Sequence, residues 1–380
     1  MVSLLEFQAK DMLRVAGIPV PDGTLVRTAD DPALGRRTGG VCKAQVAAKN
    51  RAASGGIRFA DDAASVVAEV AALLSADIAG HRAAAVLVEN RLPIAQEWFV
   101  SIITDPWGSG LVLQVSDAGG SGVEDRLSGD ARYELSFTPS APPSADSIMV
   151  TFGWSGPDVE QIARLCADLC RVALARDLLL LEVNPLAITR EGAAVVVDAH
   201  VTVDDAAEFR QEWVNSLNAD LDLVHVGRAW RRRYGGDFKV VDAAGRVAIL
   251  NTGAGAGMLV MDELARRGIH AYNFSDIRAG SPHLRRERFD AAADLICRGN
   301  EIGVVIVNIH AGITDLRTLR EDLEHVIGRF GAADLPTVVR LQGPYSEGTG
   351  AALAGLPGVV VEPQLEHAID KICDLLGVTA

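Results

Sequence analysis

The sequence is poor in aromatic residues, cysteines and surplus basic residues. Aromatic residues make up 5% of the 380 residues, which favours packed helix and sheet layers over an all-β sandwich. The five cysteines are too few, and odd in number, for a disulfide framework. Cys166 and Cys170 lie four residues apart and could share a helix face as metal ligands, although two small core residues are the simpler interpretation. Lys plus Arg number 36 against 50 Asp plus Glu, and this net charge of −14 argues against a general nucleic-acid binder.

The sequence also lacks a hydrophobic run of the roughly eighteen residues that a membrane span needs. The N-terminus, MVSLLEFQAKDMLRVAG, contains Glu6 and has no basic stretch before an apolar one, so it predicts a folded helix rather than a signal peptide. Apolar residues make up 49% of the chain, enough for large buried cores. We therefore expect a globular protein of the reducing cytoplasm, with neither nucleic acid nor a membrane as partner.

The apolar pattern predicts an α/β protein with two domains of different type. Residues 1–225 mix helices and strands without strict alternation, which indicates an α+β domain. Residues 240–380 alternate strands and helices, which is typical of a doubly wound parallel sheet. The predicted strands are 40–46, 84–89, 97–104, 110–115, 178–184, 193–198, 246–251, 269–275, 303–309, 336–341 and 358–361, and the clearest helices are 5–16 and 158–175. The boundary falls within 211–244, where the basic run 231–233 is expected to be a linker or a solvated face.

Three residues with side-chain oxygens are predicted to meet on a hairpin of the first domain. Glu182 and Asn184 share a face because side chains alternate along a strand, and the returning strand ends at Asp198. Mg²⁺ accepts such a sparse oxygen set while it keeps waters and substrate phosphates. A polar strand edge of this kind is also often structural, so the hairpin alone leaves both interpretations open.

A lysine and two further acids extend this set. Lys43 lies inside the apolar segment 41–46, where an ammonium is costly unless it meets an anion. Glu89 ends one strand and Glu97 begins the next, around a linker that could line a pocket. These residue types would suit a nucleotide with Mg²⁺. The lysine would neutralise phosphate, an acid would bind the ribose hydroxyls, and Asn with Asp would hold the metal. The sequence has no Walker A pattern, which excludes a P-loop site.

Two strand-to-helix turns in the second domain could bind anions through backbone amides. The first, NTGAGAG at 251–257, has the spacing G-x-G-x-G rather than the dinucleotide spacing G-x-G-x-x-G, although Asp276 lies about twenty residues on, where a ribose-binding acid would lie. The second, at 308–314, contains His310, for which a catalytic role and a local structural role both stay open. No histidine lies beside a nucleophile motif, so a Ser-His-Asp site is not predicted.

These motifs, in this order, resemble the β subunit of ADP-forming succinyl-CoA synthetase from end to end. The matching segments are the opening LLEFQAKDMLRVAGIPVP, the strand CKAQV, the hairpin LLEVNPLAIT with VDA, and the turns or strands NTGAG, VNIHAGI and VVRLQG. The resemblance implies an N-terminal ATP-grasp domain and a C-terminal CoA-ligase domain of flavodoxin-like topology. It also implies an ATP-dependent acid–CoA ligase that works through a phosphorylated histidine.

The resemblance assigns roles by position. It implies nucleotide contacts at Lys43, Asn50, Arg51, Ala52, Glu89, Leu92 and Glu97. It implies Mg²⁺ ligands at Asn184 and Asp198, catalytic roles for Glu182 and Arg51, and substrate contacts at Thr252, Gly312, Ile313 and Thr314. The phosphohistidine and the CoA site belong to the α subunit of that family. We therefore expect a hetero-oligomer with an α subunit. Its substrates would be ATP, CoA and a small carboxylic acid, and its metal cofactor would be Mg²⁺.

Several positions depart from the family pattern. The glycine-rich G-G-R-G-K loop of the family reads KNRAA at 49–53, and alanine there adds Cβ atoms where backbone would approach phosphate. Thr252 replaces an Asn, Arg278 lies in a stretch that is glycine-rich in the family, and His310 replaces a Phe. Three hypotheses follow: a succinate-type ligase, a paralogue for another carboxylic acid, and a non-catalytic or regulatory paralogue.

Overall fold

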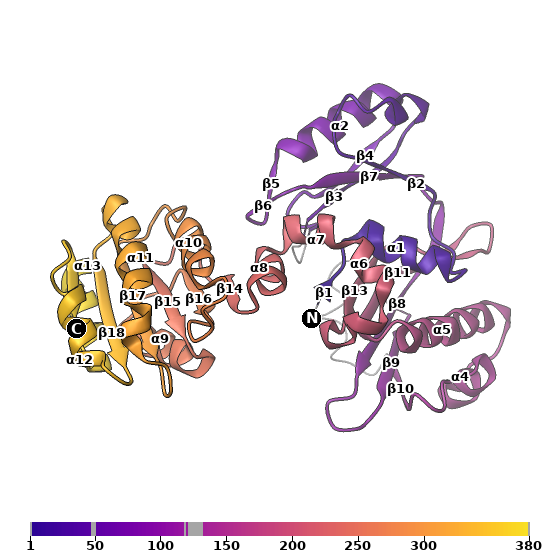
Figure 1. Ribbon diagram of the computed structural model, residues 1–380. Helices are drawn as coiled ribbons and strands as arrows, with labels where there is room; N and C mark the ends of the chain where they lie inside the picture. The colour runs from indigo at the N-terminus through magenta and orange to yellow at the C-terminus, as the bar shows by residue number, and fades with distance from the viewer. Residues whose placement is uncertain (1, 47–50, 118, 121–131, 379–380) are drawn as a thin grey trace. The chain divides into compact units, whose positions relative to one another are not determined.

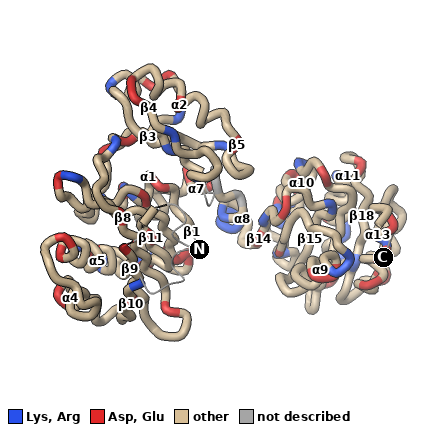
Figure 2. The backbone as a smooth tube through the Cα atoms, turned by 180° about the vertical axis from the view of Figure 1, so that it is seen from behind, with Lys and Arg blue, Asp and Glu red and all other residues tan. Residues whose placement is uncertain are grey.

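The protein is described from a computed structural model, which describes residues 2–46, 51–117, 119–120 and 132–378. The chain divides into two compact units, Met1–His225 and Val226–Ala380 (Figure 1). Acidic and basic residues are interspersed along the backbone of both units (Figure 2). Across the described ranges, no helix has the length and apolar character needed to cross a bilayer.

The first unit contains a small antiparallel sheet whose two faces differ in polarity. Its strands, in spatial order, are β2 (Gly23–Val26), β7 (Ala85–Glu89), β3 (Gly40–Gln45) and β4 (Ile57–Ala60). Cys42 and Ala44 of β3 belong to an apolar core with residues of α2 (Ala63–Ser75), which lies over one face of the sheet (Figure 1). Because side chains alternate along the strand, Lys43 lies on the opposite face.

A larger sheet forms the body of the first unit. Its strands, in spatial order, are β1 (Val2–Ser3), β13 (Ala199–Val203), β11 (Leu178–Thr189), β8 (Ile94–Thr104), β9 (Leu111–Ser116) and β10 (Arg132–Phe137), and β12 (Ala194–Val196) also pairs with β11. Helices α1 (Glu6–Val15), α4 (Ala145–Phe152) and α5 (Pro157–Ala175) contribute residues to the core on this sheet. The apolar residues of α5 recur at helical spacing and bury Cys166 and Cys170 as free thiols in the main core, so these two cysteines are core residues.

The predicted hairpin around Glu182 is present, but its returning strand differs from the one expected from the sequence. Glu182 pairs across the sheet with Ser101 of β8 and His200 of β13. The expected strand 193–198 is instead the short β12, followed by a bend, and β13 starts only at Ala199. Asp198 lies in that bend, and its carbonyl accepts a hydrogen bond from the Asn184 amide at 3.2 Å. The return of the chain therefore brings Asp198 next to Asn184, as the sequence predicts.

The second unit is a parallel sheet of flavodoxin-like order. β15 (Val247–Thr252), β17 (Val304–His310), β18 (Thr337–Gln342) and β19 (Val359–Val361) pair in parallel. β16 (Asn273–Asp276) lies on the other side of β15, joined through a parallel Val247–Ala271 bridge, and pairs with the antiparallel edge strand β14 (Asp237–Val240). The order β16-β15-β17-β18-β19 places the topological switch point, where such folds bind ligands, between β15 and β17. The α/β fold prediction is confirmed.

Helices cover both faces of the parallel sheet, as its continuous apolar strands require. α9 (Ala254–Arg266) and α13 (Leu365–Leu376) share one core with the sheet, and α10 (Arg285–Ile296) and α11 (Arg320–Ala332) share the other. The strand predicted over 269–275 begins later than expected, since β16 starts at Asn273.

The segment 211–244, within which the sequence places the domain boundary, is folded. It contains the helices α6 (Glu212–Ser216), α7 (Asn218–Val224) and α8 (Val226–Tyr234), followed by β14. The basic run 231–233 lies in the last turn of α8, where cations suit the negative end of the helix dipole, and all three arginines are exposed. Of the two interpretations of the basic run, the solvated face therefore agrees with the structure.

Candidate active site

Lys43 lies at the centre of a buried ionic cluster between the small sheet and α1. Its Nζ lies 2.8 Å from Glu6 Oε1, 2.8 Å from Glu89 Oε2 and 2.8 Å from the Val197 carbonyl oxygen. Burial by itself would lower the pKa of Lys43, but Glu6, Asp198 and Glu89 outweigh it and raise the pKa above its ordinary value. The lysine that the sequence singles out is therefore charged and paired.

Glu6 and Lys10 complete this cluster, although the sequence pattern did not identify either of them as a site residue. They lie one turn apart on α1, with Lys10 Nζ 2.7 Å from Glu6 Oε1. Lys10 also contacts both oxygens of Glu89, at 2.6 and 2.7 Å. A charged i,i+4 pair beside the buried residues of an opening helix is a signal that could have identified them.

Arg51 links the cluster to the hairpin. Its Nη2 lies 2.6 Å from Glu6 Oε2 and 2.9 Å from Asp198 Oδ2, and its Nη1 donates to the Ala44 carbonyl at 3.1 Å. Burial would lower the pKa of Arg51, but Glu6 and Asp198 raise it above its ordinary value. The side chain of Asp198 is 29% exposed, against 3% for Glu6, so Asp198 is the more accessible carboxylate of the two.

Asn184 forms hydrogen bonds with the backbone of Gly120, and the Glu97 carboxylate lies next to the same glycine. The Gly120 amide donates to Asn184 Oδ1 at 2.7 Å, and Asn184 Nδ2 donates to the Gly120 carbonyl at 3.4 Å. Gly120 has φ +86°, and a Cβ on it would lie 2.5 Å from Glu97 Oε2. A side chain at this position would be strained by the positive φ and would displace the Glu97 carboxylate. The structure thus places Glu97 close to the predicted metal hairpin.

The hairpin carries oxygen ligands that suit a small hard cation. Asn184 and Asp198 supply an amide oxygen and a carboxylate, and the backbone hydrogen bond between them keeps them adjacent. Mg²⁺ accepts two protein oxygens when waters and substrate phosphates complete its shell, so this donor set fits it. The described ranges contain no group of three His, Cys, Asp or Glu residues spaced as a metal centre. A metal here would therefore depend on the nucleotide for further ligands.

The substrate residues predicted in the second unit lie at the switch point. Thr252 Oγ1 accepts a hydrogen bond from the His310 amide at 3.0 Å, which joins the last residues of β15 and β17. The Gly253 amide donates to Asp276 Oδ1 at 2.8 Å. This hydrogen bond engages one of the backbone amides of the turn, so that amide is not available to a bound anion.

A buried polar row lies beneath this switch point. Asn308 Nδ2 donates to Asn251 Oδ1 at 2.6 Å, and Arg340 Nη1 donates to Asn308 Oδ1 at 2.9 Å. The three residues occupy matching registers on β15, β17 and β18. Burial lowers the pKa of Arg340 from its ordinary value. The row fixes the carboxyl ends of the three strands relative to one another.

The turn containing Gly312, Ile313 and Thr314 does not lead directly into a helix of α type. A 3₁₀ helix, Leu316–Leu319, comes first, because the Asp315 side chain accepts a hydrogen bond from the Arg317 amide and starts a tight turn. Ile313 is 98% exposed. The first α-helix after this turn is therefore α11, so no α-helix begins at the turn itself.

Other predicted residues lie outside the ionic cluster. Ala52 is exposed in the turn after the lysine strand, Leu92 is half-buried between β7 and β8, and Asn50 is outside the described residues. Glu182 has a polar contact of its own and faces its cross-strand neighbour His200. Lys43, Arg51, Glu89 and Asp198 are thus brought together, whereas Ala52 and Leu92 are not.

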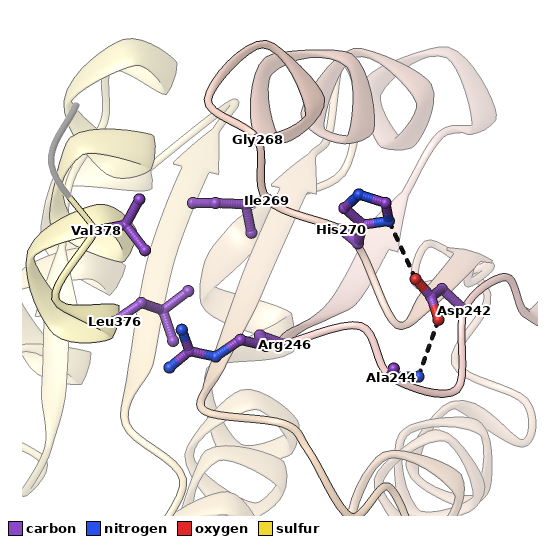
Figure 3. Close-up of a pocket in the computed structure, with 8 residues that line it drawn as sticks. All are labelled: Asp242, Ala244, Arg246, Gly268, Ile269, His270, Leu376 and Val378. Atoms are coloured by element: carbon purple, nitrogen blue, oxygen red, sulfur yellow. Dashed lines mark hydrogen bonds and ion pairs between the residues drawn. The ribbon is translucent and has the colours of Figure 1, made fainter.

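Two cavities border the described side chains. One, of about 160 Å³, is lined by residues of α1, β2 and β7: Phe7, Lys10, Asp11, Arg14, Gly23, Leu25, Leu87 and Glu89. The other, of about 290 Å³, lies in the second unit between the end of α13 and the turns that precede β15 and β16, and includes Arg246 and the ion pair His270–Asp242 (Figure 3). Arg246 directly precedes β15, so this second cavity is at the amino ends of the strands, opposite Thr252. None of the predicted site residues that the structure describes lines it.

Comparisons with known proteins give the family. A family model for the ATP-grasp domain matches residues 3–188. The β subunit of ADP-forming succinate–CoA ligase from Halorhodospira halophila is 30% identical over the full length of both chains, and that from Acidithiobacillus ferrooxidans is 31% identical over 99% of this chain and 100% of the relative. ATP citrate lyase from Methanothrix soehngenii, solved with citrate and coenzyme A, has a TM-score of 0.69 at 18% identity over 99% of each chain, which shows a shared fold. The chain therefore belongs to the family of ADP-forming succinate–CoA ligase β subunits, which are carbon–sulfur ligases, and combines an ATP-grasp domain with a parallel-sheet domain.

Proposed function

We propose that this chain is the nucleotide-binding subunit of an acid–CoA ligase and that it phosphorylates a histidine of an α subunit. The observation that carries this proposal is the position of Lys43 and Arg51 beside the Asn184–Asp198 hairpin. Two cations next to a pair of metal-binding oxygens form a suitable environment for a triphosphate. The domain assignment follows: nucleotide on residues 1–225, and acid and partner on residues 240–380.

Phosphoryl transfer needs positioning and charge neutralisation more than covalent help from the protein. Lys43 and Arg51 would neutralise the β- and γ-phosphates as the partner's imidazole nitrogen attacks the γ-phosphorus and the bond to ADP breaks. Asn184 and Asp198 would hold Mg²⁺, which supplies further neutralisation of phosphate oxygens. Glu97 and Glu89 would hold the ribose and base region, and Glu182 would orient the partner's histidine.

The phosphoryl group would then pass from histidine to the carboxylate of the acid, and the CoA thiol would displace phosphate from the acyl phosphate. The CoA site and the histidine would lie on the α subunit in an αβ or α₂β₂ assembly. Thr252 and Gly312 to Thr314 would contact the acid through the turns at the switch point, where open α/β sheets bind ligands.

The test is phosphohistidine formation in the complex reconstituted from this chain and its α subunit. Asp198→Ala removes a metal ligand and the partner of Arg51, and we expect at least about a hundredfold slower labelling from γ-labelled ATP. Asp204→Ala is the control, because this carboxylate caps the turn after β13 through the Ala206 amide. Undiminished labelling in the Asp198 variant would contradict the proposal.

A second candidate is the same reaction on a different carboxylic acid. The observation that favours it is the Thr252–His310 hydrogen bond, because both residues depart from the family pattern at the acid site. A panel of acids compared by CoA-dependent ADP release separates the two. Succinate reacting fastest would remove this candidate.

A third candidate is a non-catalytic or regulatory paralogue. In its favour, Ala52 and Ala53 stand in the loop that is glycine-rich in the family, and the Lys43 ammonium is already paired with Glu6, Glu89 and the Val197 carbonyl. Calorimetry with Mg–ATP decides this question. Tight binding counts against a non-catalytic role, and no binding even with the α subunit present would support it.

A further inference from the structure

Lys43 is surrounded by protein acceptors in the nucleotide-free chain. Of the three donors of its ammonium, two hydrogen-bond to Glu6 Oε1 and to the Val197 carbonyl, both at 2.8 Å, and the ammonium also forms an ion pair with Glu89 Oε2 at 2.8 Å. The Lys43 side chain is 5% exposed, so water has little access to its ammonium group. A phosphate oxygen can reach this ammonium only when one of the three acceptors leaves.

Glu6 is the acceptor that the cations of the cluster share. Its Oε1 lies 2.7 Å from Lys10 and 2.8 Å from Lys43, and its Oε2 lies 2.6 Å from Arg51. Gln45 Nε2 also donates to Oε2, at 3.5 Å. A carboxylate surrounded by three cations uses the same charge-assisted donors that a phosphate oxygen would use.

The contacts of Glu6 join two parts of the first unit. Lys43 belongs to β3 of the small sheet and Arg51 follows that strand, whereas Glu6 belongs to α1. The Lys10–Glu89 and Arg51–Asp198 pairs connect the small sheet and its following turn to the rest of the unit. Three cations, Lys10, Lys43 and Arg51, face three carboxylates, Glu6, Glu89 and Asp198, so the cluster is electrically balanced without a ligand.

We propose that Glu6 sets the nucleotide affinity of this ionic cluster: its carboxylate holds Lys43 and Arg51 in the nucleotide-free chain, and a phosphate oxygen takes over both cations when the nucleotide binds. Lys10 keeps its contact with Glu6 during this exchange, because the two residues share one helix and move together. The inference rests on the proposed function and adds to it a residue that competes with the ligand. Removing the charge of Glu6 then frees donors for phosphate.

The test is isothermal titration of the full-length chain with Mg–ADP and, separately, with adenosine. Glu6→Gln keeps the size of the side chain and removes its charge, and we expect it to bind Mg–ADP about tenfold more tightly than the wild type. Adenosine has no phosphate, so its affinity is expected to stay unchanged. Glu69→Gln is the matched control, because Glu69 pairs with Arg58 near the surface, at 3.0 Å, and its Mg–ADP affinity is expected to equal that of the wild type.

A second variant guards against misfolding, since Glu6→Gln leaves buried cations with fewer counter-charges. The double variant Glu6→Gln with Lys10→Gln removes one charge of each sign and keeps the cluster balanced. Tighter Mg–ADP binding in either folded variant supports the proposal, and unchanged or weaker binding overturns it. If the wild type itself binds no Mg–ADP, the proposed function fails, which is a different result.

Discussion

Arg51 and Asp198 are 147 residues apart in the chain, yet Arg51 Nη2 lies 2.9 Å from Asp198 Oδ2. One residue follows a strand of the small sheet and the other lies in the bend between β12 and β13. Their contact connects the proposed phosphate-binding residues to the proposed metal hairpin. A cation bound at Asp198 would weaken this ion pair and leave Arg51 more available to phosphate, so metal and nucleotide should bind cooperatively.

Gly120→Ala should weaken nucleotide binding by moving Glu97. The new Cβ would lie 2.5 Å from Glu97 Oε2, and the flexible carboxylate will move more easily than the backbone. We expect a roughly tenfold higher Kd for Mg–ATP, together with about 1 kcal/mol of lost stability from the positive φ. Calorimetry and denaturant unfolding measure the two effects.

Gly192→Ala is the matched control for this change. Gly192 has φ +83°, close to the φ of +86° at Gly120, but a Cβ added to Gly192 would have no neighbour within 4 Å among the described residues. The two variants should therefore lose similar stability from backbone strain, and only Gly120→Ala should lose affinity. Equal affinities in the two variants would contradict a role for the Glu97–Gly120 contact.

Thr252→Val should raise the KM for the acid and leave the KM for ATP unchanged. The substitution keeps the shape of the side chain and removes the acceptor of the His310 amide, which lies 3.0 Å away. The ends of β15 and β17 then lose this side-chain hydrogen bond, at a cost of about 1 kcal/mol in stability. Steady-state kinetics of the reconstituted complex with varied acid and varied ATP separates the two constants.

Thr349→Val serves as its control, because the buried hydroxyl of Thr349 has no hydrogen-bond partner within the described part of the chain. Removing an unsatisfied hydroxyl should be neutral or stabilising. A shift in both KM values for Thr252→Val, or the same loss of stability in both variants, would mean that Thr252 has only a general structural role.

The stability of the first unit should fall in acid through Glu6. Burial alone would raise the pKa of Glu6, but Arg51, Lys43 and Lys10 outweigh it and hold the pKa well below the ordinary value. A carboxyl whose folded pKa is depressed contributes stability above its unfolded pKa, about 4.3, and loses it as the pH falls toward the folded pKa. Thermal unfolding from about pH 6 to about pH 3 should therefore show a steeper decline for the wild type than for Glu6→Gln. Parallel curves would contradict this coupling.

Alkylation should distinguish one cysteine from the other four. Cys297 is exposed, whereas Cys42, Cys166, Cys170 and Cys373 are buried. Burial raises the pKa of Cys42 to about 11 and that of Cys170 to about 12, which removes the reactive thiolate at neutral pH. Mass spectrometry after iodoacetamide treatment of the native chain should find one adduct, on Cys297. Rapid labelling of Cys166 without unfolding would contradict the packing of α5.

Features that depend on local pattern could be predicted from the sequence. The position of Lys43 within the apolar segment 41–46 predicted that its ammonium meets an anion, and the run of apolar strands in residues 240–380 predicted the parallel sheet. The hairpin around Asn184 followed from strand periodicity and a turn. These properties can be read from sequence because each is set by neighbouring residues within one or two elements.

The contacts of Lys43 could not be predicted from the sequence, because they depend on how whole elements pack. Glu6 and Lys10 look like an ordinary charged pair on an amphipathic helix, and nothing in their spacing shows that α1 packs against the small sheet. The same holds for Arg51 with Asp198 and for Thr252 with His310, which meet through chain folding over long sequence separations. Burial away from water makes such ionic contacts specific and costly to leave incomplete, so they are fixed by the packing of whole elements rather than by any local pattern.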